Sequence, residues 1–124
     1  MRILVGWDDL GEAETISLVL NVDENSAEVF TEPTAFTKAL HKGGWDTILL
    51  ALNFPNDDDA FDFFQKTRRS LPEAPVLGAW KSGEIVQLAK FISHGLRMNI
   101  PRDANGEYLF LLLYLIESAY TAVQ

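Results

Sequence analysis

The chain has 124 residues, 48% of them hydrophobic, a formal net charge of −8 at pH 7 and no cysteine. This length suits one compact domain, and the acidic charge disfavours nucleic acid and acidic membrane surfaces as partners. The absence of cysteine excludes disulfides and thiolate metal sites.

The apolar runs of the chain are too short for a targeting or spanning segment. The N-terminal run "MRILVGW" turns acidic too quickly for a signal peptide. The longest run, Tyr108–Ile116, is far below the roughly 20 residues that a membrane-spanning helix needs. We therefore expect a soluble, cytoplasmic protein. Residues 1–124 would form one domain, either by itself or cut from a longer multidomain chain.

Short apolar runs alternate with longer amphipathic segments along the whole chain. The short runs predict strands, because strands buried on both faces of a sheet are continuously apolar. The longer segments carry apolar residues at helical spacing, which predicts helices. The predicted strands are 2–7, 27–31, 46–52, 74–80 and 96–100, and the predicted helices are 12–20, 33–43, 57–70, 82–95 and 104–123.

Five strand–helix repeats predict an α/β fold. Parallel strands joined by right-handed crossovers give a five-stranded, doubly wound sheet with helices on both faces. Functional residues of such folds lie outside the carboxyl ends of the strands. In this sequence those ends fall at 8–9, 31–32, 51–53, 79–80 and 101–102.

Four stretches of the sequence resemble the receiver domain of two-component response regulators. "ILVGWDD" resembles the first strand of that family with its acidic pair, and "WDTILLALNFPNDDDAFDFF" resembles the third strand and the turn after it. "APVLGAW" resembles the fourth strand, and "HGLRMNIPRD" resembles the run into the fifth strand with its lysine–proline step. The resemblance covers nearly the whole chain and implies a flavodoxin-like receiver fold.

The resemblance also implies where a phosphorylation site would lie. In that family an aspartate after the third strand accepts a phosphoryl group, and an acidic pair helps to hold Mg²⁺. A hydroxyl after the fourth strand and a lysine after the fifth contact the phosphoryl oxygens. The acidic pair corresponds to Asp8 and Asp9, the acceptor to Ala51, the metal-contacting carbonyl to Asn53, the hydroxyl to Trp80 (or Ala79, one residue earlier) and the lysine to Arg102.

Three of these positions have lost the chemistry of phosphoryl transfer. Ala51 has no oxygen, nitrogen or sulfur that accepts a phosphoryl group. Neither Ala79 nor Trp80 carries a hydroxyl, and the planar guanidinium of Arg102 differs from a lysine ammonium. The sequence therefore predicts a degenerate pseudo-receiver, a signalling domain without enzymatic activity that is not phosphorylated at the usual position.

A divalent cation is the one cofactor that the sequence leaves open. Asp8, Asp9 and the Asn53 carbonyl would hold Mg²⁺ weakly, because position 51 adds no third carboxylate. The alternative is a vestigial acidic pair that is neutralised by Arg102. His41 and His94 stand at predicted helix ends without a third ligand nearby in sequence, so they do not indicate a metal site.

The sequence is also compatible with two other functions. The first is a working phosphorelay receiver that uses another carboxylate, such as Asp8, Asp9 or Asp57. Residues 57–59 have a structural explanation as well, because acids favour the first turn of a helix. The second is a small-ligand sensor in which Trp7 and Trp80 stack on a planar ligand; the alternative is that these rings fill the old phosphate pocket or pack under a loop.

The last predicted helix indicates a protein interface. Its segment "YLFLLLYLI" is apolar all round, whereas a helix on one face of a sheet needs only one apolar stripe. The resemblance implies a partner or a homodimer through the fourth helix, fifth strand and fifth helix. The acidic charge argues against contact with nucleic acid or membrane. The candidate interface residues are Phe91, Tyr108, Leu112, Tyr114 and Leu115.

Overall fold

The structure, a computed structural model, describes residues 1–81 and 85–123 and contains one five-stranded sheet. All neighbouring strands are parallel, and their order across the sheet is β2-β1-β3-β4-β5. This confirms the predicted doubly wound α/β fold. The strands are β1 (Arg2–Gly6), β2 (Ser26–Phe30), β3 (Thr47–Ala51), β4 (Val76–Trp80) and β5 (Met98–Pro101).

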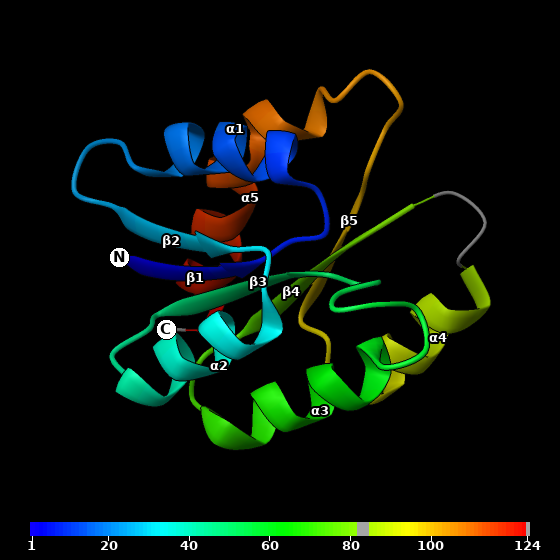
Figure 1. Ribbon diagram of the computed structural model, residues 1–124. Helices are drawn as coiled ribbons and strands as arrows, with labels where there is room; N and C mark the ends of the chain where they lie inside the picture. The colour runs from blue at the N-terminus through cyan, green and yellow to red at the C-terminus, as the bar shows by residue number, and fades with distance from the viewer. Residues whose placement is uncertain (82–84, 124) are drawn as a thin grey trace.

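Five helices cover the two faces of the sheet (Figure 1). α1 and α5 lie together on one face, and α2, α3 and α4 lie on the other. This division follows from right-handed crossovers in a sheet whose strand order reverses after β2. The helices are α1 (Leu10–Leu20), α2 (Pro33–Lys42), α3 (Ala60–Ser70), α4 (Ile85–Ser93) and α5 (Tyr108–Val123). No helix in the described part of the chain combines the length and apolarity needed to cross a bilayer.

The central strands form the core because both of their faces are covered. All five residues of β3 are buried, as are the first four of β4 and the last four of β1. The edge strands β2 and β5 each bury one residue fully, Ala27 and Ile100. The parallel register sets Ala51 opposite Ala79 and Trp80 opposite Pro101, so the carboxyl ends of these strands meet at one edge of the sheet.

The starts of three helices differ from the sequence prediction. α1 begins at Leu10 rather than at residue 12. α3 begins at Ala60 rather than at residue 57, because Asn56 and Asp59 close a turn in front of it. The amide nitrogen of Asp59 donates to Asn56 Oδ1 at 2.9 Å, and Asn56 Nδ2 donates to Asp59 Oδ2 at 3.0 Å. α5 begins at Tyr108 rather than at residue 104. The predicted start of α4, at 82–84, lies outside the described residues.

Candidate functional site

Arg102 is the centre of the strand-end site. It follows β5, and only 3% of its side chain is exposed. Its Nη1 lies 2.9 Å from Oδ1 of Asp8, the residue that follows Trp7 after β1. Its Nη2 donates to Oε1 of Glu12 in α1 at 2.8 Å. One buried guanidinium therefore pairs with two carboxylates that come from the opposite end of the chain.

Two aromatic side chains enclose this ion pair. The guanidinium carbon of Arg102 lies 4.6 Å from the ring centroid of Trp7, which is fully buried. Trp7 Nε1 donates to Glu12 Oε1 at 3.2 Å, and the Tyr108 hydroxyl donates to the same oxygen. Arg102 Nε donates to the Tyr108 hydroxyl at 3.3 Å. We call Trp7, Asp8, Glu12, Arg102 and Tyr108 the Arg102 cluster.

The Arg102 cluster shifts the titration of its own members. Burial would raise the pKa of Asp8, but the Asn53 hydrogen bond and the charges of Arg102 and Lys81 outweigh it and lower that pKa. Burial likewise opposes ionisation of Glu12, yet hydrogen bonds from Tyr108, Arg102 and Trp7 lower its pKa. Burial and the hydrogen bond to Glu12 raise the pKa of Tyr108 to about 12. Asp8, Glu12 and Arg102 are therefore charged at neutral pH and Tyr108 is neutral.

Asp8 also has two partners besides Arg102. Asn53 Nδ2 donates to Asp8 Oδ2 at 2.9 Å, and Lys81 Nζ lies 3.2 Å from the same oxygen. Only 14% of the Asp8 side chain is exposed. Both carboxylate oxygens are therefore engaged by this protein's own cations and amide.

The residues at this edge do not fit a magnesium site. Asp9 does not join Asp8, because it caps α1 by accepting a hydrogen bond from the Glu12 amide at 2.8 Å. Ala51 is buried at the end of β3 and adds no ligand. Asn53 Oδ1 is buried without a hydrogen-bond partner, but it is one neutral oxygen beside a carboxylate already held by Arg102. Within residues 1–81 and 85–123, no three His, Cys, Asp or Glu side chains group together as metal ligands would.

The Trp80 side chain is directed away from the Arg102 cluster, although the Trp80 carbonyl accepts a hydrogen bond from the Arg102 amide at 2.9 Å. Its Nε1 donates to Asn99 Oδ1 at 3.0 Å, and its ring lines a small void with Leu88 and Phe91 of α4. Trp7 stacks instead with Tyr108 of α5, with ring centroids 6.5 Å apart. The structure therefore does not bring Trp7 and Trp80 together as two walls of one ligand site. Ala79, the other residue considered for the hydroxyl position, is buried.

Asp57, Asp58 and Asp59 are exposed and lie in front of α3 rather than in its first turn. Only Asp62 places an acid in that first turn. The sequence prediction for this segment is therefore wrong in position. No hydrogen bond or ion pair of the described residues links Asp57 to the Arg102 cluster.

The predicted interface set needs correction for three of its five residues. Phe91, Tyr108 and Leu112 are buried, because they lie on the sides of α4 and α5 that face the core. Leu115 is partly buried against that core, whereas Tyr114 is 72% exposed. Phe110 and Leu111, which the sequence analysis did not select, are 74% and 56% exposed. The exposed large apolar side chains of α5 are therefore Phe110, Leu111 and Tyr114, here called the α5 patch.

The sequence analysis did not predict that two members of the Arg102 cluster, Glu12 and Tyr108, are partners of Arg102. Glu12 was assigned only to a helix, and Tyr108 only to an interface. Their positions held one signal: Glu12 lies one turn after the first strand end, and Tyr108 follows the fifth strand end by a short loop. Both therefore had to lie near the edge of the sheet where Arg102 emerges.

Comparison with known proteins identifies the fold but not a sequence family. No family model matches the chain, and no curated protein matches its sequence. Among solved structures, a CheY-like receiver domain protein from Methanospirillum hungatei superposes with a TM-score of 0.82 at 15% identity, covering 98% of this chain and 94% of that one. An orphan response regulator of H. pylori gives 0.80 at 17% identity, with 97% and 96% covered.

The same fold also occurs as part of longer proteins. NtrX from Brucella abortus superposes with a TM-score of 0.81 at 17% identity, and the match covers 98% of this chain but 27% of NtrX. The chain thus spans about a quarter of that protein's length. These likenesses, together with the strand order and the position of the strand-end site, show that the chain has the fold of response-regulator receiver domains.

Proposed function

We propose that this protein is a pseudo-receiver: a receiver-like signalling domain that works without phosphorylation and without catalysis. The observation that carries the proposal is the ion pairing of buried Arg102 with Asp8 and Glu12 beside Ala51. Position 51 provides no nucleophile. The nearby carboxylate that would attract a metal ion is already neutralised by protein cations.

A fixed ion-pair network favours one conformation over a switch between two. Arg102 joins the end of β5 to the end of β1 and to α1, and Tyr108 joins α5 to the same point. These links are internal to the chain and need no ligand to form. The network would therefore hold the α1–α5 side of the sheet in a constant arrangement, which suits a domain whose output is a constant binding surface.

One of the similar solved structures supports this type of function. It is an atypical orphan response regulator whose description names a phosphorylation-independent regulatory mechanism; its TM-score is 0.78 at 16% identity, with 98% of this chain covered. We propose the same class of behaviour here, in the cytoplasm, with a protein partner or a second copy as the target. A single domain of this kind would act through contact alone.

We expect no phosphoryl transfer to the native chain. After incubation with Mg²⁺ and a small-molecule phosphodonor such as acetyl phosphate, its intact mass should be unchanged, because Ala51 has no acceptor atom. An Ala51→Asp variant run in parallel tests whether the rest of the site remains competent. We expect it to stay unmodified too, since Arg102 and Lys81 already engage Asp8.

A phosphoryl adduct on the native chain would overturn the proposal. Peptide mapping would then separate the alternatives, because an adduct on Asp8, Asp9 or Asp57 marks a phosphorelay receiver with a displaced acceptor. An adduct on the Ala51→Asp variant alone would leave the native protein a pseudo-receiver. It would also show that one substitution had silenced an otherwise working site.

The α5 patch is the proposed binding surface of this pseudo-receiver. Phe110 and Tyr114 lie one turn apart on the solvent side of α5, so changing both to Ser removes apolar surface without opening the core. We expect Phe110→Ser/Tyr114→Ser to keep its native melting temperature within a few degrees and to lose concentration-dependent self-association in sedimentation velocity. The matched control is Leu18→Ser, which removes an exposed apolar side chain from α1.

Sedimentation of the native chain as a monomer at all concentrations would exclude the homodimer and leave a different protein as the partner. Equal self-association of the native chain and the double variant would exclude the α5 patch as the self-contact surface. An equal loss of self-association in the Leu18→Ser control would show that α1 also takes part in the contact.

A further inference from the structure

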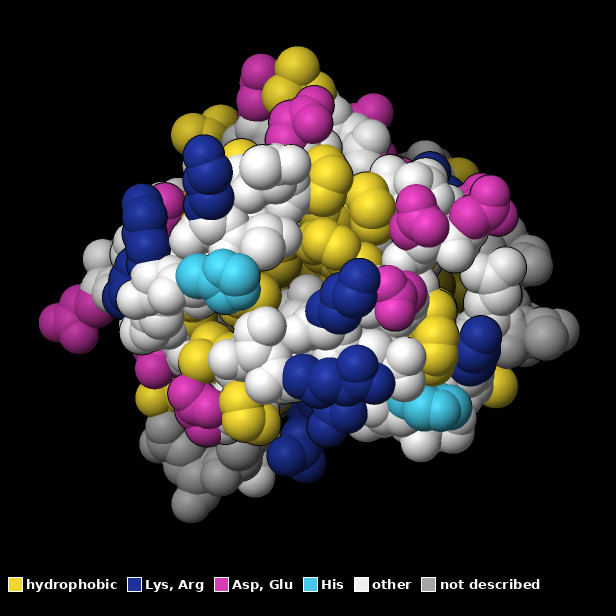
Figure 2. Space-filling model, turned by 60° about the horizontal axis from the view of Figure 1, so that its bottom comes forward, with side chains coloured by type: hydrophobic (Ala, Val, Ile, Leu, Met, Phe, Trp, Pro, Cys, Tyr) yellow, Lys and Arg dark blue, Asp and Glu magenta, His cyan; other side chains and the backbone are white. Residues whose placement is uncertain are grey.

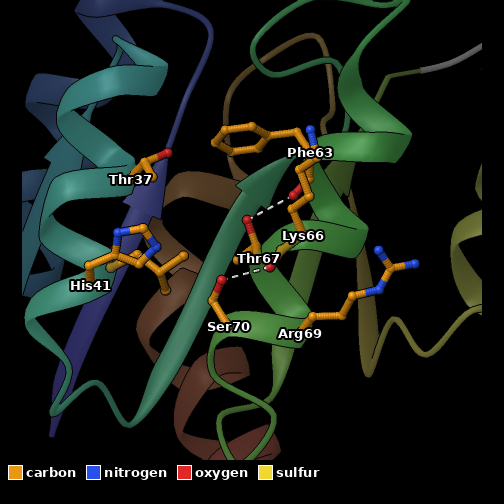
Figure 3. A pocket seen from close by; sticks show the side chains of 8 residues that line it. Thr37, His41, Phe63, Lys66, Thr67, Arg69 and Ser70 are labelled. Atoms are coloured by element: carbon orange, nitrogen blue, oxygen red, sulfur yellow. Dashed lines mark hydrogen bonds between the residues drawn. The ribbon is translucent and has the colours of Figure 1, made fainter.

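A second surface with binding features lies on the opposite face of the sheet from α5. It is an open groove of about 500 Å³ between α2 and α3. Figure 3 shows His41 and Thr37 on α2 facing Phe63, Lys66 and Thr67 on α3 across this space. Neither the Arg102 cluster nor the α5 patch contributes to it, so the proposed function leaves it unexplained.

The floor of the groove is apolar and recessed. Leu40 is 5% exposed, and partly buried Phe63 packs against Phe36 and Phe54 with ring centroids 5.4 Å and 5.2 Å away. The hydroxyl of Thr67 donates to the Phe63 carbonyl at 2.9 Å. The Ser70 hydroxyl donates within α3 in the same way, also at 2.9 Å (Figure 3). These hydroxyl protons are used inside the helix, so the floor offers contact for apolar groups.

The rim of the groove is cationic, in a chain whose net charge is −8. Lys and Arg side chains gather over this face of the molecule, with apolar side chains visible in the hollows between them (Figure 2). α2 and α3 hold half of the ten Lys and Arg residues of the chain but only one of its 18 acids, Asp62. Those five cations are Lys38, Lys42, Lys66, Arg68 and Arg69.

Most of this positive charge is not neutralised internally. Asp62 pairs with Lys66 at 2.9 Å, and both side chains are largely exposed. Arg68 Nη1 donates to the His94 carbonyl at 2.6 Å, which leaves its charge uncompensated. Within residues 1–81 and 85–123, Lys38, Lys42 and Arg69 make no ion pair. An exposed pair such as Asp62–Lys66 holds its partners weakly, so Lys66 can exchange to an incoming carboxylate.

We propose that the α2–α3 groove binds an acidic amphipathic helix of a partner protein. Its apolar side chains would enter the space over Leu40 and Phe63, and its carboxylates would pair with Lys66 on one side and Lys38 on the other. Arg69 lines the groove but its guanidinium points away from α2 (Figure 3), so it would add positive charge at the edge of the site. A groove between two helices that takes the apolar face of a third is a recurring mode of peptide recognition. Charge complementarity selects an acidic helix over a basic one.

The shape of the groove argues against other anionic partners. A membrane surface needs protruding apolar side chains, whereas Leu40 is recessed between the helices. Nucleic acid would meet the repulsion of the remaining acidic surface and would leave the apolar floor unused. A small organic anion is poorly enclosed by an open groove, because small-molecule sites bury most of their ligand.

The test uses a synthetic probe peptide of about 18 residues, long enough to form a helix, with Leu at helical spacing on one face and Glu on the other. Its binding to the full chain is followed by fluorescence anisotropy of a peptide label and by NMR shifts of the protein amides. We expect shifts concentrated on α2 and α3, and affinity that falls as salt is added. Lys66→Glu/Arg69→Glu should weaken binding at least tenfold.

Two control variants distinguish binding in the groove from electrostatic attraction between the peptide and the protein as a whole. Lys90→Glu/Arg97→Glu makes the same change in net charge on α4 and at residue 97 before β5, and it should bind the peptide within about twofold of the native chain. Thr37→Arg adds a positive charge but fills the groove, and it should still weaken binding.

Several results would overturn the proposal. These are equal binding of a peptide with Lys in place of Glu, equal loss in both charge-reversal variants, tighter binding by Thr37→Arg, and no binding of the acidic peptide. Groove-dependent binding of anionic lipid vesicles or of a DNA duplex, without binding of the acidic peptide, would assign the surface to that other class of partner.

Discussion

Arg102→Ala is expected to lower the free energy of unfolding by about 2–4 kcal/mol at neutral pH. Removing one partner of a buried ion pair usually costs about 3–5 kcal/mol, because a charge is left uncompensated inside the protein. Here two carboxylates lose their partner, but Glu12 remains 34% exposed and Asp8 keeps Lys81 and Asn53. Solvent and these remaining partners reduce the expected loss.

Urea unfolding at several pH values measures this effect. The fold lowers the pKa values of Asp8 and Glu12, so their stabilising contribution is complete above their ordinary values and is lost as pH falls through the lowered ones. The difference between Arg102→Ala and the native chain should therefore shrink as pH falls from about 6 to about 3. Arg102→Lys keeps the charge but not the planar guanidinium that pairs with Asp8 and Glu12 at once, so it should lose less stability than Arg102→Ala.

An exposed arginine serves as the control for these measurements. Arg69→Ala, on the rim of the α2–α3 groove, should change stability by less than about 0.5 kcal/mol. If Arg102→Ala and Arg69→Ala unfold at the same urea concentration at neutral pH, the Arg102 cluster does not stabilise the domain. The conformational part of the proposed function would then fail.

Trp7→Ala is expected to be the most damaging single substitution, at about 3–5 kcal/mol. The Trp7 side chain is fully buried, stacks on Tyr108 and lies against the Arg102 guanidinium. Its removal would leave a cavity in the core. It would also remove one hydrogen-bond donor from Glu12. Chemical unfolding followed by circular dichroism measures the loss. The far-ultraviolet signal is preferred because it does not depend on the deleted indole.

Two further variants show whether Trp7 acts through Arg102. Trp7→Phe keeps a smaller aromatic ring but removes the indole N–H, so its cost should be below that of Trp7→Ala. The double variant Trp7→Ala/Arg102→Ala should lose less stability than the two single losses added together, because the side chains touch. Full additivity would mean that the two residues stabilise the domain independently.

The fold was predictable from sequence because its central strands are simple. A run such as "TILLA" does not alternate polar with apolar residues, and even its Thr47 is buried. That pattern occurs where helices cover both faces of a parallel sheet. Helix starts were less predictable. Asp57 and Asp58 have the composition of a helix start, yet the side chain of Asn56 pairs with Asp59 and postpones α3 to Ala60. Such a local hydrogen bond competes with the helix and leaves no periodic signal.

The site was predictable only for residues whose location follows from the strand topology alone. Asp8, Ala51 and Arg102 stand at strand ends, so the topology alone brings them to one edge of the sheet. The partners of Arg102 depend on side-chain directions, which sequence spacing does not give. Tyr108 illustrates the difference: it opens an apolar run, but its hydroxyl turns inward to Glu12 and Arg102. Because the rotation of α5 about its axis was not known from sequence, Leu112 was predicted at the surface, whereas it lies in the core.

The uneven distribution of charge gives the molecule a large electric dipole moment. α2 and α3 hold five Lys and Arg residues, whereas α1 and α5, across the sheet, hold Glu12, Glu14 and Glu117 and no Lys or Arg. The electric field of a charged neighbour exerts a torque on a dipole, so the domain would be oriented before the two molecules come into contact. An acidic neighbour would meet α2 and α3 first despite the net repulsion. The rate of such encounters should fall with added salt faster than the lifetime of the resulting complexes.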